Sequence, residues 1–428
     1  MSTPLRIGII GMGGFAMRHH DAALYLEQQG ECQLICACDP AMDTFAARQE
    51  ELHFAERNVR TFLDYRDMLA QYGDQLDVVT IPTPIPLHAP MHKACVDLGI
   101  PVYLEKPPTL YYTELAEMLA VEEHARKLTN VGFNFIVQEE RQALKQRICS
   151  GEFGKVKRVG FFGLWPRGRN YYNRASWAGR LQLNGRLVLD SCVGNAMAHY
   201  AHDALFWAGA TPSTWGEVST VTAELYRANA IEGTDTIFTK TQIANGPEVL
   251  IAMTHSCYGR ETDQEWVECE NATLISGNDD NGKYIEIRWN NGQQANEIVR
   301  FNGADLVVRN FHAYFAYIRD ENDRPVTRLI DSRPFVYLND IAYIAAKHIS
   351  TIPESAVQYK ENPAGDIFTE ITGISEIVRQ FMETGALPSE QGISWATQPG
   401  TATQDDLTQL DDVIAKMVKA REEELASV

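Results

Sequence analysis

The feature that most constrains this chain is a short apolar segment that runs directly into a glycine-rich turn near the N-terminus. Residues 5–10 are typical of a buried strand, and Gly11, Gly13 and Ala16 then fit the pattern G-x-G-x-x-G/A. The first glycine of this pattern makes a tight turn, the second lets the backbone approach a pyrophosphate, and the small third residue packs helix on strand. The start of the following helix offers free N–H groups to phosphates. The predicted nucleotide contacts are Gly11, Gly13, Gly14, Phe15 and Ala16, and a purely structural turn is the alternative.

A second predicted strand, at residues 34–39, ends in the carboxylate of Asp39. A carboxylate at this place accepts hydrogen bonds from the ribose hydroxyls of adenosine and repels a 2′-phosphate. Residues 40–43 supply no Arg or Lys that would offset the repulsion. The sequence therefore predicts NAD rather than NADP as the cofactor, with a helix cap at the strand end as the alternative role of Asp39.

Length and charge limit the classes of function that the chain can have. A chain of 428 residues with 45% hydrophobic content is expected to form two domains. The net charge of −19 argues against nonspecific nucleic-acid binding and against docking on anionic membranes. No apolar run approaches membrane-spanning length, and the first strand leaves no space for a signal peptide, so we expect a cytoplasmic protein.

The eight cysteines are scattered and are typical of small buried hydrophobic residues. Cys36 and Cys38 would share one face of a strand, but no second Cys/His pair stands at zinc-ligand spacing. We therefore predict no metal site.

The first third of the chain alternates predicted strands with helices. The strands are expected at residues 5–10, 34–39, 77–81, 101–104 and about 129–133. This alternation predicts a Rossmann domain, a doubly wound parallel sheet, over residues 1–132. Because ligands bind such sheets at the carboxyl ends of the strands, the residues just after each strand are expected to carry the chemistry.

From residue 133 the pattern changes to one helix, at 138–149, followed by many strands. The strands are expected at residues 155–164, 216–226, 235–244, 248–256, 265–275, 283–289 and 296–301. In the sixth of these, alternation puts Ile285, Ile287 and Trp289 on one face. We expect an α+β domain over residues 133–385, with a large, mainly antiparallel open sheet and helices on one face.

The last part of the chain predicts helices near 339–348 and 366–383, then a polar stretch and an amphipathic final helix. We assign residues 386–428 to this polar segment and helix. Such a tail packs on its own domain or on a neighbouring subunit.

Two strand ends carry unusual residues, Thr83-Pro84 with His88 after one strand and Glu105-Lys106-Pro107 after the next. With the glycine turn, Asp39 and the later turn Gly151-Glu-Phe-Gly154, they make the chain resemble the Gfo/Idh/MocA family, which is named for glucose-fructose oxidoreductase, inositol dehydrogenase and rhizopine catabolism. The resemblance runs across nearly the whole chain. It implies nicotinamide-dependent oxidation or reduction of a sugar, polyol or related alcohol, and a homodimer or homotetramer formed through the C-terminal sheet.

The resemblance also places Lys106 in or beside the active site. A lysine next to a cationic nicotinamide loses part of its proton affinity, so Lys106 would orient or deprotonate the reacting hydroxyl. A surface lysine paired with Glu105 is the alternative. The further cofactor contacts implied by the resemblance are Thr83, Pro84, His88, Glu105 and Lys106.

Residues 165–180 are rich in aromatic side chains and arginines. Aromatic faces suit the C–H surfaces of sugars, and arginines donate hydrogen bonds to hydroxyls, carboxylates or phosphates. The candidate substrate residues in this segment are Trp165, Arg167, Tyr172 and Trp177. In the alternative interpretation the aromatic residues anchor a loop and the arginines are solvated.

A helix predicted from about Asn195 would place Asn195, His199, His202 and Asp203 on one face, because they stand three or four residues apart. The family that the chain resembles usually carries an aspartate four residues before a histidine here, and His199 matches the histidine. Asn195 occupies the place of the aspartate, and Asp190 lies nine residues before His199. Either His199 is a weaker base assisted by Asp190 or Asp203, or proton transfer falls mainly to Lys106.

We therefore predict Lys106 and His199 as catalytic, with Asp190, Asn195, His199 and His202 as further substrate candidates. His199 and His202 have metal-ligand spacing, but no third ligand is evident, and packing in the core is the favoured interpretation of His202.

The leading hypothesis is an NAD-dependent dehydrogenase that acts on a secondary hydroxyl of a sugar, glycoside or cyclitol. A redox-neutral, NAD-dependent enzyme that cleaves glycosides is a second hypothesis. A non-catalytic, nucleotide-sensing regulator on the same fold is a third, and the departure at Asn195 is its main support.

Overall fold

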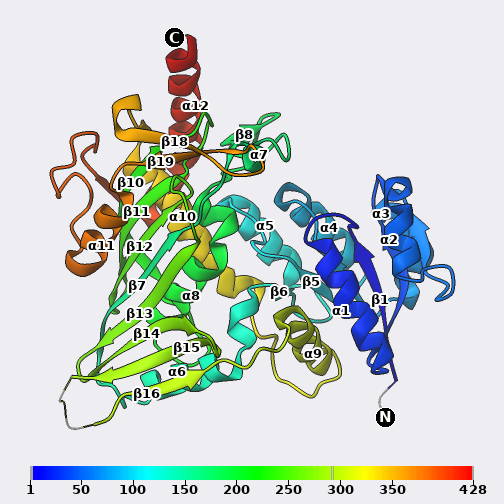
Figure 1. Cartoon of the computed structure of the whole chain (residues 1–428). Coiled ribbons are helices and arrows are strands. Elements are labelled where there is room, and N and C mark those ends of the chain that lie inside the picture. The colour runs from blue at the N-terminus through cyan, green and yellow to red at the C-terminus, as the bar shows by residue number, and fades with distance from the viewer. Residues whose placement is uncertain (1–2, 291, 293, 427–428) are drawn as a thin grey trace. The chain divides into compact units, whose positions relative to one another are not determined.

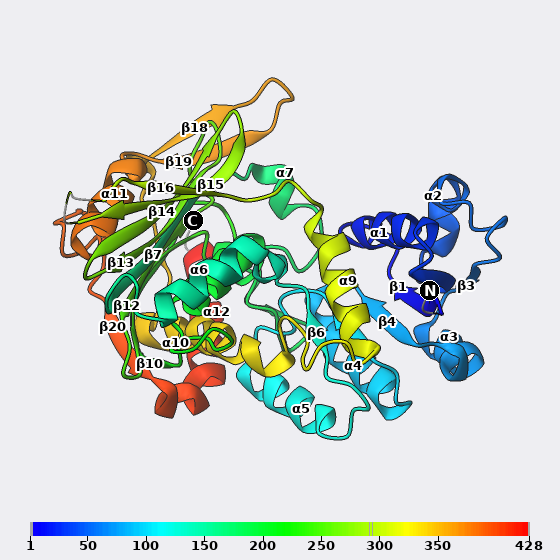
Figure 2. The same ribbon diagram turned by 90° about the horizontal axis from the view of Figure 1, so that it is seen from below.

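The computed structural model describes residues 3–290, 292 and 294–426 and divides into two compact units (Figure 1 and Figure 2). One unit comprises Met1–Glu139 and Asn302–Arg333, and the other Glu140–Phe301 and Pro334–Val428. The chain therefore leaves the first unit, builds most of the second and returns once to the first before it finishes in the second.

The first unit contains a parallel sheet of six strands in the order β3-β2-β1-β4-β5-β6, which confirms the predicted doubly wound fold. The strands are β1 (Leu5–Ile10), β2 (Cys32–Cys38), β3 (Arg60–Phe62), β4 (Val78–Ile81), β5 (Val102–Leu104) and β6 (Asn130–Val131). The helices are α1 (Ala16–Gln28), α2 (Ala46–Glu51), α3 (Tyr65–Tyr72), α4 (His88–Asp97) and α5 (Tyr112–Glu122). Strand β3 was not expected, because its three residues are not buried and carry no apolar run.

Burial explains why the central strands form. All residues of β4 and of β5 are buried, as are the last four of β1, because helices cover both faces of a parallel sheet. The carboxyl ends of β1, β4 and β5 lie next to one another in the strand order. The loops that follow these strands therefore meet at one edge of the sheet.

The boundary predicted at residue 132 is wrong for the first unit, because helix α9 (Leu306–Ile318) returns to it. Asp305 caps this helix by accepting hydrogen bonds from the N–H groups of Val307 and Val308. The apolar face of α9, with Phe311 and Tyr314, packs into the same core as β1 and α1. A helix with so large an apolar face must bury it, and the core of the first unit provides the partner.

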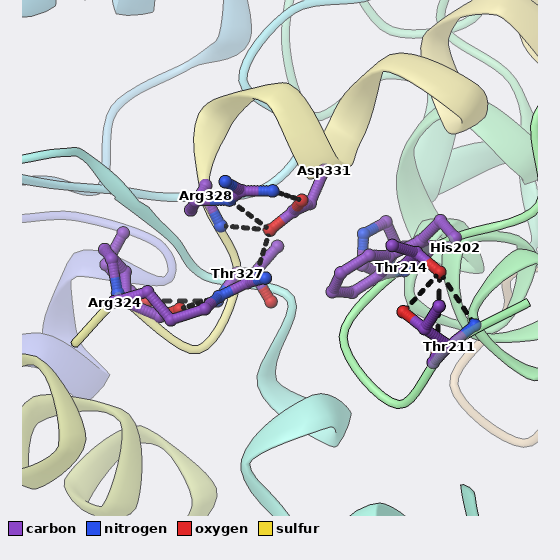
Figure 3. Close-up of polar contacts among 10 residues, drawn as sticks. His202, Thr211, Thr214, Arg324, Thr327, Arg328 and Asp331 are labelled. Carbon is purple, nitrogen blue, oxygen red and sulfur yellow. Dashed lines mark hydrogen bonds and ion pairs between the residues drawn. The ribbon is translucent and has the colours of Figure 1, made fainter. Parts of the chain in front are cut away.

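The segment after α9 is fastened to β6. The N–H of Val131 donates to the carbonyl oxygen of Thr327, and the carboxylate of Asp331 accepts hydrogen bonds from Arg324 and Arg328 (Figure 3). Asp331 is buried, so its two arginine partners compensate the cost of burying the charge.

The second unit contains a sheet of ten strands in the order β16-β15-β14-β13-β7-β12-β11-β10-β17, with β20 paired to β10. The strands are β7 (Val156–Leu164), β10 (Val218–Arg227), β11 (Thr236–Ile243), β12 (Glu248–Thr254), β13 (Thr262–Cys269), β14 (Ala272–Asp279), β15 (Gly282–Trp289), β16 (Glu297–Arg300), β17 (Ser350–Thr351) and β20 (Gly400–Thr403). Two further hairpins are β8 (Gln182–Leu183) with β9 (Arg186–Leu187), and β18 (Val357–Glu361) with β19 (Ile367–Ile371).

The prediction of a large, mainly antiparallel sheet is confirmed, with parallel pairs only at β7–β12 and β10–β17 among the described strands. The alternation in β15 is confirmed as well, since Ile285 and Ile287 are buried and Trp289 is half-buried. The single strand expected at 265–275 is wrong: the chain turns at Glu270 and Asn271, so the segment belongs to the two antiparallel strands β13 and β14.

Helices cover the middle of this sheet on both faces, not on one. The helices of the unit are α6 (Glu139–Cys149), α7 (Arg169–Tyr172), α8 (Ala198–Ala208), α10 (Arg333–Ala346), α11 (Ile374–Thr384) and α12 (Leu410–Ala426). On β7, Phe161 stacks on Tyr200 of α8, whereas Phe162 and Leu164 point the other way, into a core shared with α11.

The C-terminal residues belong to the second unit. The predicted boundary at 385 had assigned them to a segment of their own. Strand β20 extends the large sheet beside β10, and α12 buries Leu410, Ile414 and Met417. The helix predicted at 366–383 is also shorter than expected, because its first residues form β19 and α11 begins at Ile374. Among the helices of the described residues, none is long and apolar enough to cross a membrane.

We predict that Phe311→Ala destabilises the first unit. Phe311 is fully buried against His19, Tyr103 and Phe315, and Phe→Ala in a core costs about 3–5 kcal/mol of unfolding free energy. Urea unfolding should show this loss. The control is Tyr25→Ala on exposed α1 surface, where a change within about 0.5 kcal/mol is expected. Equal effects of the two substitutions would contradict the packing of α9 on this unit.

Candidate active site

The glycine turn lies at the carboxyl end of β1, as the sequence predicts. Gly11 has a φ of +123°, and a Cβ atom there would lie 3.2 Å from the carbonyl oxygen of Pro82 and 3.3 Å from the Cβ of Ala16. Any larger residue would push helix α1 or the loop after β4 away from β1. Ala16 is fully buried, as the close packing of helix on strand requires.

The start of α1 has room and donors for a phosphate group. Phe15 stands at the N-cap position without a side-chain cap, and the N–H groups of Ala16, Met17 and Arg18 donate to the carbonyl oxygens of Gly13, Gly14 and Phe15, so the candidate donors to a phosphate are the N–H groups of the glycine turn itself. A Cβ atom on Gly14, whose φ is +57°, would meet nothing within 4 Å. This open, uncapped helix start fits a bound pyrophosphate. The assignment of Gly11, Gly13, Gly14 and Phe15 as cofactor contacts stays a prediction.

A buried histidine that the sequence analysis missed holds the turn in place. His20 is fully buried, and its Nε2 lies 3.0 Å from the carbonyl oxygen of Gly11. Burial lowers the pKa of His20 to about 4, so the ring is neutral near neutral pH and donates one hydrogen bond to that carbonyl. The sequence signal that could have found His20 is a histidine at a position of the helix that faces the core.

Asp39 lies directly after β2 beside the glycine turn. Its carboxylate accepts hydrogen bonds from the N–H groups of Met12, at 2.9 Å, and Ala41, at 2.8 Å. The bond to Ala41 closes a local turn at the end of the strand, which is close to the capping role considered as the alternative for Asp39. The bond to Met12 connects the carboxylate to the glycine turn. Asp39 is half-buried and each oxygen retains a further lone pair, so the geometry accommodates a ribose contact as well.

The loop after β4 is tied to the loop after β5 by His88. His88 is fully buried, with Nε2 2.8 Å from the carbonyl oxygen of Thr83 and Nδ1 3.0 Å from that of Pro107. His88 thus connects the two loops, and its predicted role toward the cofactor, by positioning them, stays a prediction. Thr83 is half-buried and Pro84 exposed at the sheet edge, and their cofactor contacts stay predictions.

Glu105 holds the loop after β5 in place. It is buried, and its carboxylate lies 3.0 Å from Nε2 of His19 on α1 and accepts a hydrogen bond from the backbone N–H of Lys106 at 3.1 Å. Both partners therefore fix the position of the next residue. Lys106 itself is half-buried at the carboxyl edge of the sheet, where the chemistry of such folds is located.

In the second unit, three of the four arginines of residues 165–180 are paired with carboxylates, and the fourth, Arg169, lies over the ring of Tyr359. Arg167 lies 2.7 Å from Glu261, Arg174 3.6 Å from Asp190, and Arg180 3.5 Å from Glu232. Trp165 donates from its indole N–H to Asp263 at 3.2 Å. The segment is thus anchored by polar groups, whereas the alternative interpretation expected aromatic anchors and solvated arginines, and the roles of Trp165, Arg167, Tyr172 and Trp177 in substrate binding stay predictions.

Arg174 lies against two aromatic rings of this segment. Its guanidinium carbon lies 3.7 Å from the ring centre of Tyr171 and 4.7 Å from that of Trp177. Tyr172, next in the chain, has a buried hydroxyl with no hydrogen-bond partner, and burial raises the pKa of that hydroxyl. These contacts give residues 171–177 a fixed shape.

The helix after this segment begins later than predicted. A π-helical turn, Cys192–Ala196, comes first, and α8 begins at Ala198. The face shared by Asn195 and His199, which was expected from α-helical spacing, stays a prediction, because a π-helical turn precedes α8. His199 is half-buried in the first turn of α8. A Cβ on Gly163 of β7 would lie 2.4 Å from Sδ of Met197, so glycine is needed where this turn packs on the sheet.

Asp190 and Asn195 meet just before this helix. The side-chain amide of Asn195 donates to the carboxylate of Asp190 at 3.0 Å, and the N–H of Gly179 donates to the other oxygen at 2.7 Å. Asp190 is buried, and burial raises the pKa of its carboxyl. The carboxylate absent from position 195 is therefore supplied beside that position by Asp190.

His202 is a core residue. It is fully buried, its Nδ1 accepts a hydrogen bond from the indole N–H of Trp215 at 3.3 Å, and it precedes the loop in which Thr211 and Thr214 bond to each other (Figure 3). The structure thus favours the packed interpretation and removes His202 from the candidate substrate contacts, because its ring has no exposed surface.

Asp203 does not assist His199, as one alternative proposed. Its carboxylate is fully buried and accepts a hydrogen bond from Arg141, which also binds Glu265 through two bonds of 2.9 Å. Burial raises the pKa of Asp203 well above its usual value. The three side chains form a buried ion network that joins α6, α8 and β13. No group of three or more His, Cys, Asp or Glu side chains among the described residues could hold a metal ion.

Comparison with known proteins identifies the N-terminal part of the chain. Residues 5–133 match a family model described as an oxidoreductase family with the NAD-binding Rossmann fold. This model is that of the Gfo/Idh/MocA family, and it covers less than a third of the chain. Members of this family are NAD-dependent oxidoreductases, and NAD is the cofactor of this chain.

Relatives within and beyond this domain support the assignment. An inositol 2-dehydrogenase of Rhodococcus erythropolis is 31% identical over 152 residues, which is 35% of this chain and 42% of that protein. An uncharacterized oxidoreductase of Synechocystis sp. is 25% identical over 295 residues, 66% of this chain and 74% of that protein. A solved structure of the WlbA dehydrogenase from Bordetella pertussis, in complex with NADH and UDP-GlcNAcA, has a TM-score of 0.64 at 20% identity. It covers 80% of this chain and 97% of that chain, and at this identity it shows the fold alone.

We predict that Asp39→Asn weakens the preference of this NAD-binding domain for NAD over NADP. The amide loses charged acceptor capacity for the ribose and no longer repels a 2′-phosphate, which together shift the ratio of the dissociation constants by about tenfold or more. Isothermal titration calorimetry with both nucleotides measures the ratio. Asp43→Asn, an exposed neighbour, is the control and should leave the ratio unchanged. An unchanged ratio in Asp39→Asn would contradict the ribose contact.

Proposed function

We propose that this protein is a dehydrogenase that oxidises a secondary hydroxyl of an uncharged sugar, glycoside or cyclitol. The observation that carries the proposal is the position of Lys106 at the carboxyl edge of the parallel sheet. There Glu105 and the Pro107 carbonyl are held by His19 and His88, in the same unit as the glycine turn. A lysine held at this edge, where ligands bind in such sheets, suits a role in proton transfer.

The chemistry divides between cofactor and side chains. When bound at the glycine turn, NAD⁺ supplies the acceptor for the hydride that leaves the carbon of the alcohol. The hydroxyl proton needs a base, and we assign it to Nζ of Lys106, with the imidazole of His199 as the second group that holds the hydroxyl. A cationic neighbour favours the neutral amine of a lysine and so its action as a base.

Two observations support an uncharged substrate with hydroxyl groups. The relative named inositol 2-dehydrogenase acts, by its name, on a cyclitol. In the second unit, three of the four arginines of residues 165–180 pair with carboxylates and Arg169 lies over the ring of Tyr359, so most of the positive charge of the segment is already balanced and its aromatic surface is what suits the C–H groups of a sugar.

The decisive assay mixes the purified protein with NAD⁺ and a panel of sugars, cyclitols and aryl glycosides, and follows NADH absorbance and aglycone release together. Net NADH supports the dehydrogenase. Release of aglycone that requires NAD⁺ without net NADH supports the redox-neutral alternative. Binding of NAD⁺ with neither signal across the panel supports the regulator. The cytoplasmic location and the homo-oligomer formed through the C-terminal sheet stay predictions.

We predict that Lys106→Met lowers kcat by about 10²-fold to 10⁴-fold, the usual contribution of a positioned general base. The affinity for NAD should change far less, because the glycine turn and Asp39 stay intact. Steady-state kinetics and calorimetry separate the two effects. Lys93→Met, which removes a lysine paired with Asp97 on the surface of α4, is the matched control. Turnover that survives in Lys106→Met would show that the base lies elsewhere.

A further inference from the structure

Helix α7, which lies within the segment of aromatic residues and arginines, starts beside the β18–β19 hairpin (Figure 1). Gly168, the residue before α7, pairs with Phe368 of β19 in an antiparallel bridge. The guanidinium carbon of Arg169, the first residue of the helix, lies 5.6 Å from the ring centre of Tyr359 on β18. A hairpin that is distant in the sequence therefore contacts the start of α7.

The carboxylate of Asp366 caps this helix from the hairpin. It accepts a hydrogen bond from the backbone N–H of Asn170, the second residue of α7, at 3.1 Å. The residue at the N-cap position, Gly168, has no side chain that could accept this bond. A helix of one turn has few hydrogen bonds of its own, so the carboxylate supplies an important part of what fixes its start.

Gly168 is needed for space and not for its backbone conformation. Its φ of −81° and ψ of 177° are accessible to any residue. A Cβ atom there would lie 2.1 Å from one carboxylate oxygen of Asp366 and 2.4 Å from its Cγ. The glycine thus leaves room for the carboxylate that caps the helix in its place, and a larger residue would push that carboxylate away.

The hairpin that carries Asp366 is itself held firmly. Ile371 of β19 is fully buried in a core with Leu164 of β7, and its N–H donates to the carbonyl oxygen of Ser256 at 3.0 Å. In the turn of the hairpin, the side-chain oxygen of Asn362 accepts a hydrogen bond from the N–H of Asp366 at 3.0 Å. The position of the carboxylate is therefore set by the hairpin.

The cap lies next to the aromatic surface of the segment. Tyr171, one residue after Asn170, has its ring 5.6 Å from that of the buried His255. The guanidinium of Arg174 lies over the ring of Tyr171 and also contacts the ring of Trp177. A shift at the start of α7 would therefore move the first ring of this stack.

We propose that Asp366 is a positioning residue for substrate, because it holds α7 so that Tyr171, Arg174 and Trp177 keep one arrangement when an uncharged sugar or cyclitol binds. This inference rests on the proposed function, which assigns the aromatic surface of residues 165–180 to the substrate. Asp366 acts through α7 and does not contact substrate. Loss of the cap lowers the fraction of molecules whose surface is ready to bind, and the apparent affinity falls with that fraction.

The experiment measures KM and kcat of three variants on the best substrate of the panel. Asp366→Ala should raise KM about fivefold, which is the fold-change that the usual loss of a capping side chain corresponds to, and should leave kcat unchanged. Asp366→Asn should keep KM within about twofold of the wild-type value, since an amide oxygen caps a helix as well as a carboxylate does. Gly168→Ala should raise KM as Asp366→Ala does.

The double variant, Gly168→Ala with Asp366→Ala, tests whether the glycine acts through the carboxylate. The three atoms nearest to the added Cβ all belong to that carboxylate, so the double variant should have the KM of Asp366→Ala alone. The matched controls are Asp280→Ala, an exposed residue in the turn between β14 and β15, and Gly303→Ala, where a Cβ would meet nothing within 4 Å. Both should keep the wild-type KM and kcat.

Hydrogen exchange of the same proteins gives a readout that does not depend on turnover. The backbone N–H groups of residues 169–173 should exchange about fivefold faster in Asp366→Ala and Gly168→Ala than in the wild-type protein. Asp366→Asn and the controls should exchange as the wild-type protein does. Kinetics are compared well below the lowest Tm of the set, so that a change in KM does not reflect unfolding.

The outcomes separate the two proposals. An active wild-type protein with a raised KM in Asp366→Ala and a near-normal KM in Asp366→Asn supports the inference. A KM that stays at the wild-type value in Asp366→Ala, or a fall in kcat in place of a rise in KM, overturns the positioning role. A wild-type protein that oxidises no member of the panel rejects the proposed function and with it the role toward substrate. Unchanged exchange at residues 169–173 in Asp366→Ala would reject the cap itself.

Discussion

The constraint on which the first unit depends is the close approach of helix α1 to strand β1 at Gly11. A Cβ atom at this position would crowd both Ala16 and the loop after β4, so one missing side chain sets the spacing of three elements. His20 then bonds to the carbonyl of the same glycine, and His19, one residue earlier, reaches Glu105 after β5. Two adjacent histidines on one helix thus connect the glycine turn with the lysine loop.

The second unit follows a different principle, in which buried charges are satisfied in small groups. Arg141 donates hydrogen bonds to Asp203 and Glu265. Asp190, just before α8, accepts hydrogen bonds from Gly179 and Asn195 and lies near Arg174. The first group fastens α6 and α8 to the sheet. The second lies where the backbone departs from regular geometry, between the left-handed Leu189 and the π-helical turn.

Local patterns predicted much of the fold because their physical causes are local. The glycine turn, the strands of the parallel sheet and the alternation in β15 follow from backbone geometry and from one-sided burial. The sequence analysis missed that helix α9 is a part of the first unit. Its apolar face packs on β1 and α1, and residues Glu140–Phe301 of the second unit stand between these elements and α9 in the chain. The hairpin of β13 and β14 was read as one strand because Glu270 and Asn271 give only a short turn signal.

The candidate site divides in the same way. The sequence by itself determined the nucleotide-binding turn, the carboxylate of Asp39 and the place of Lys106 after a buried strand, because each is fixed by neighbours within a few residues. Only the tertiary structure decided that His202 and Asp203 belong to the core and that Asp190 lies against Asn195. The burial of a side chain and the partner of a charge depend on residues that are distant in the chain. The spacing of residues along the sequence does not predict such contacts.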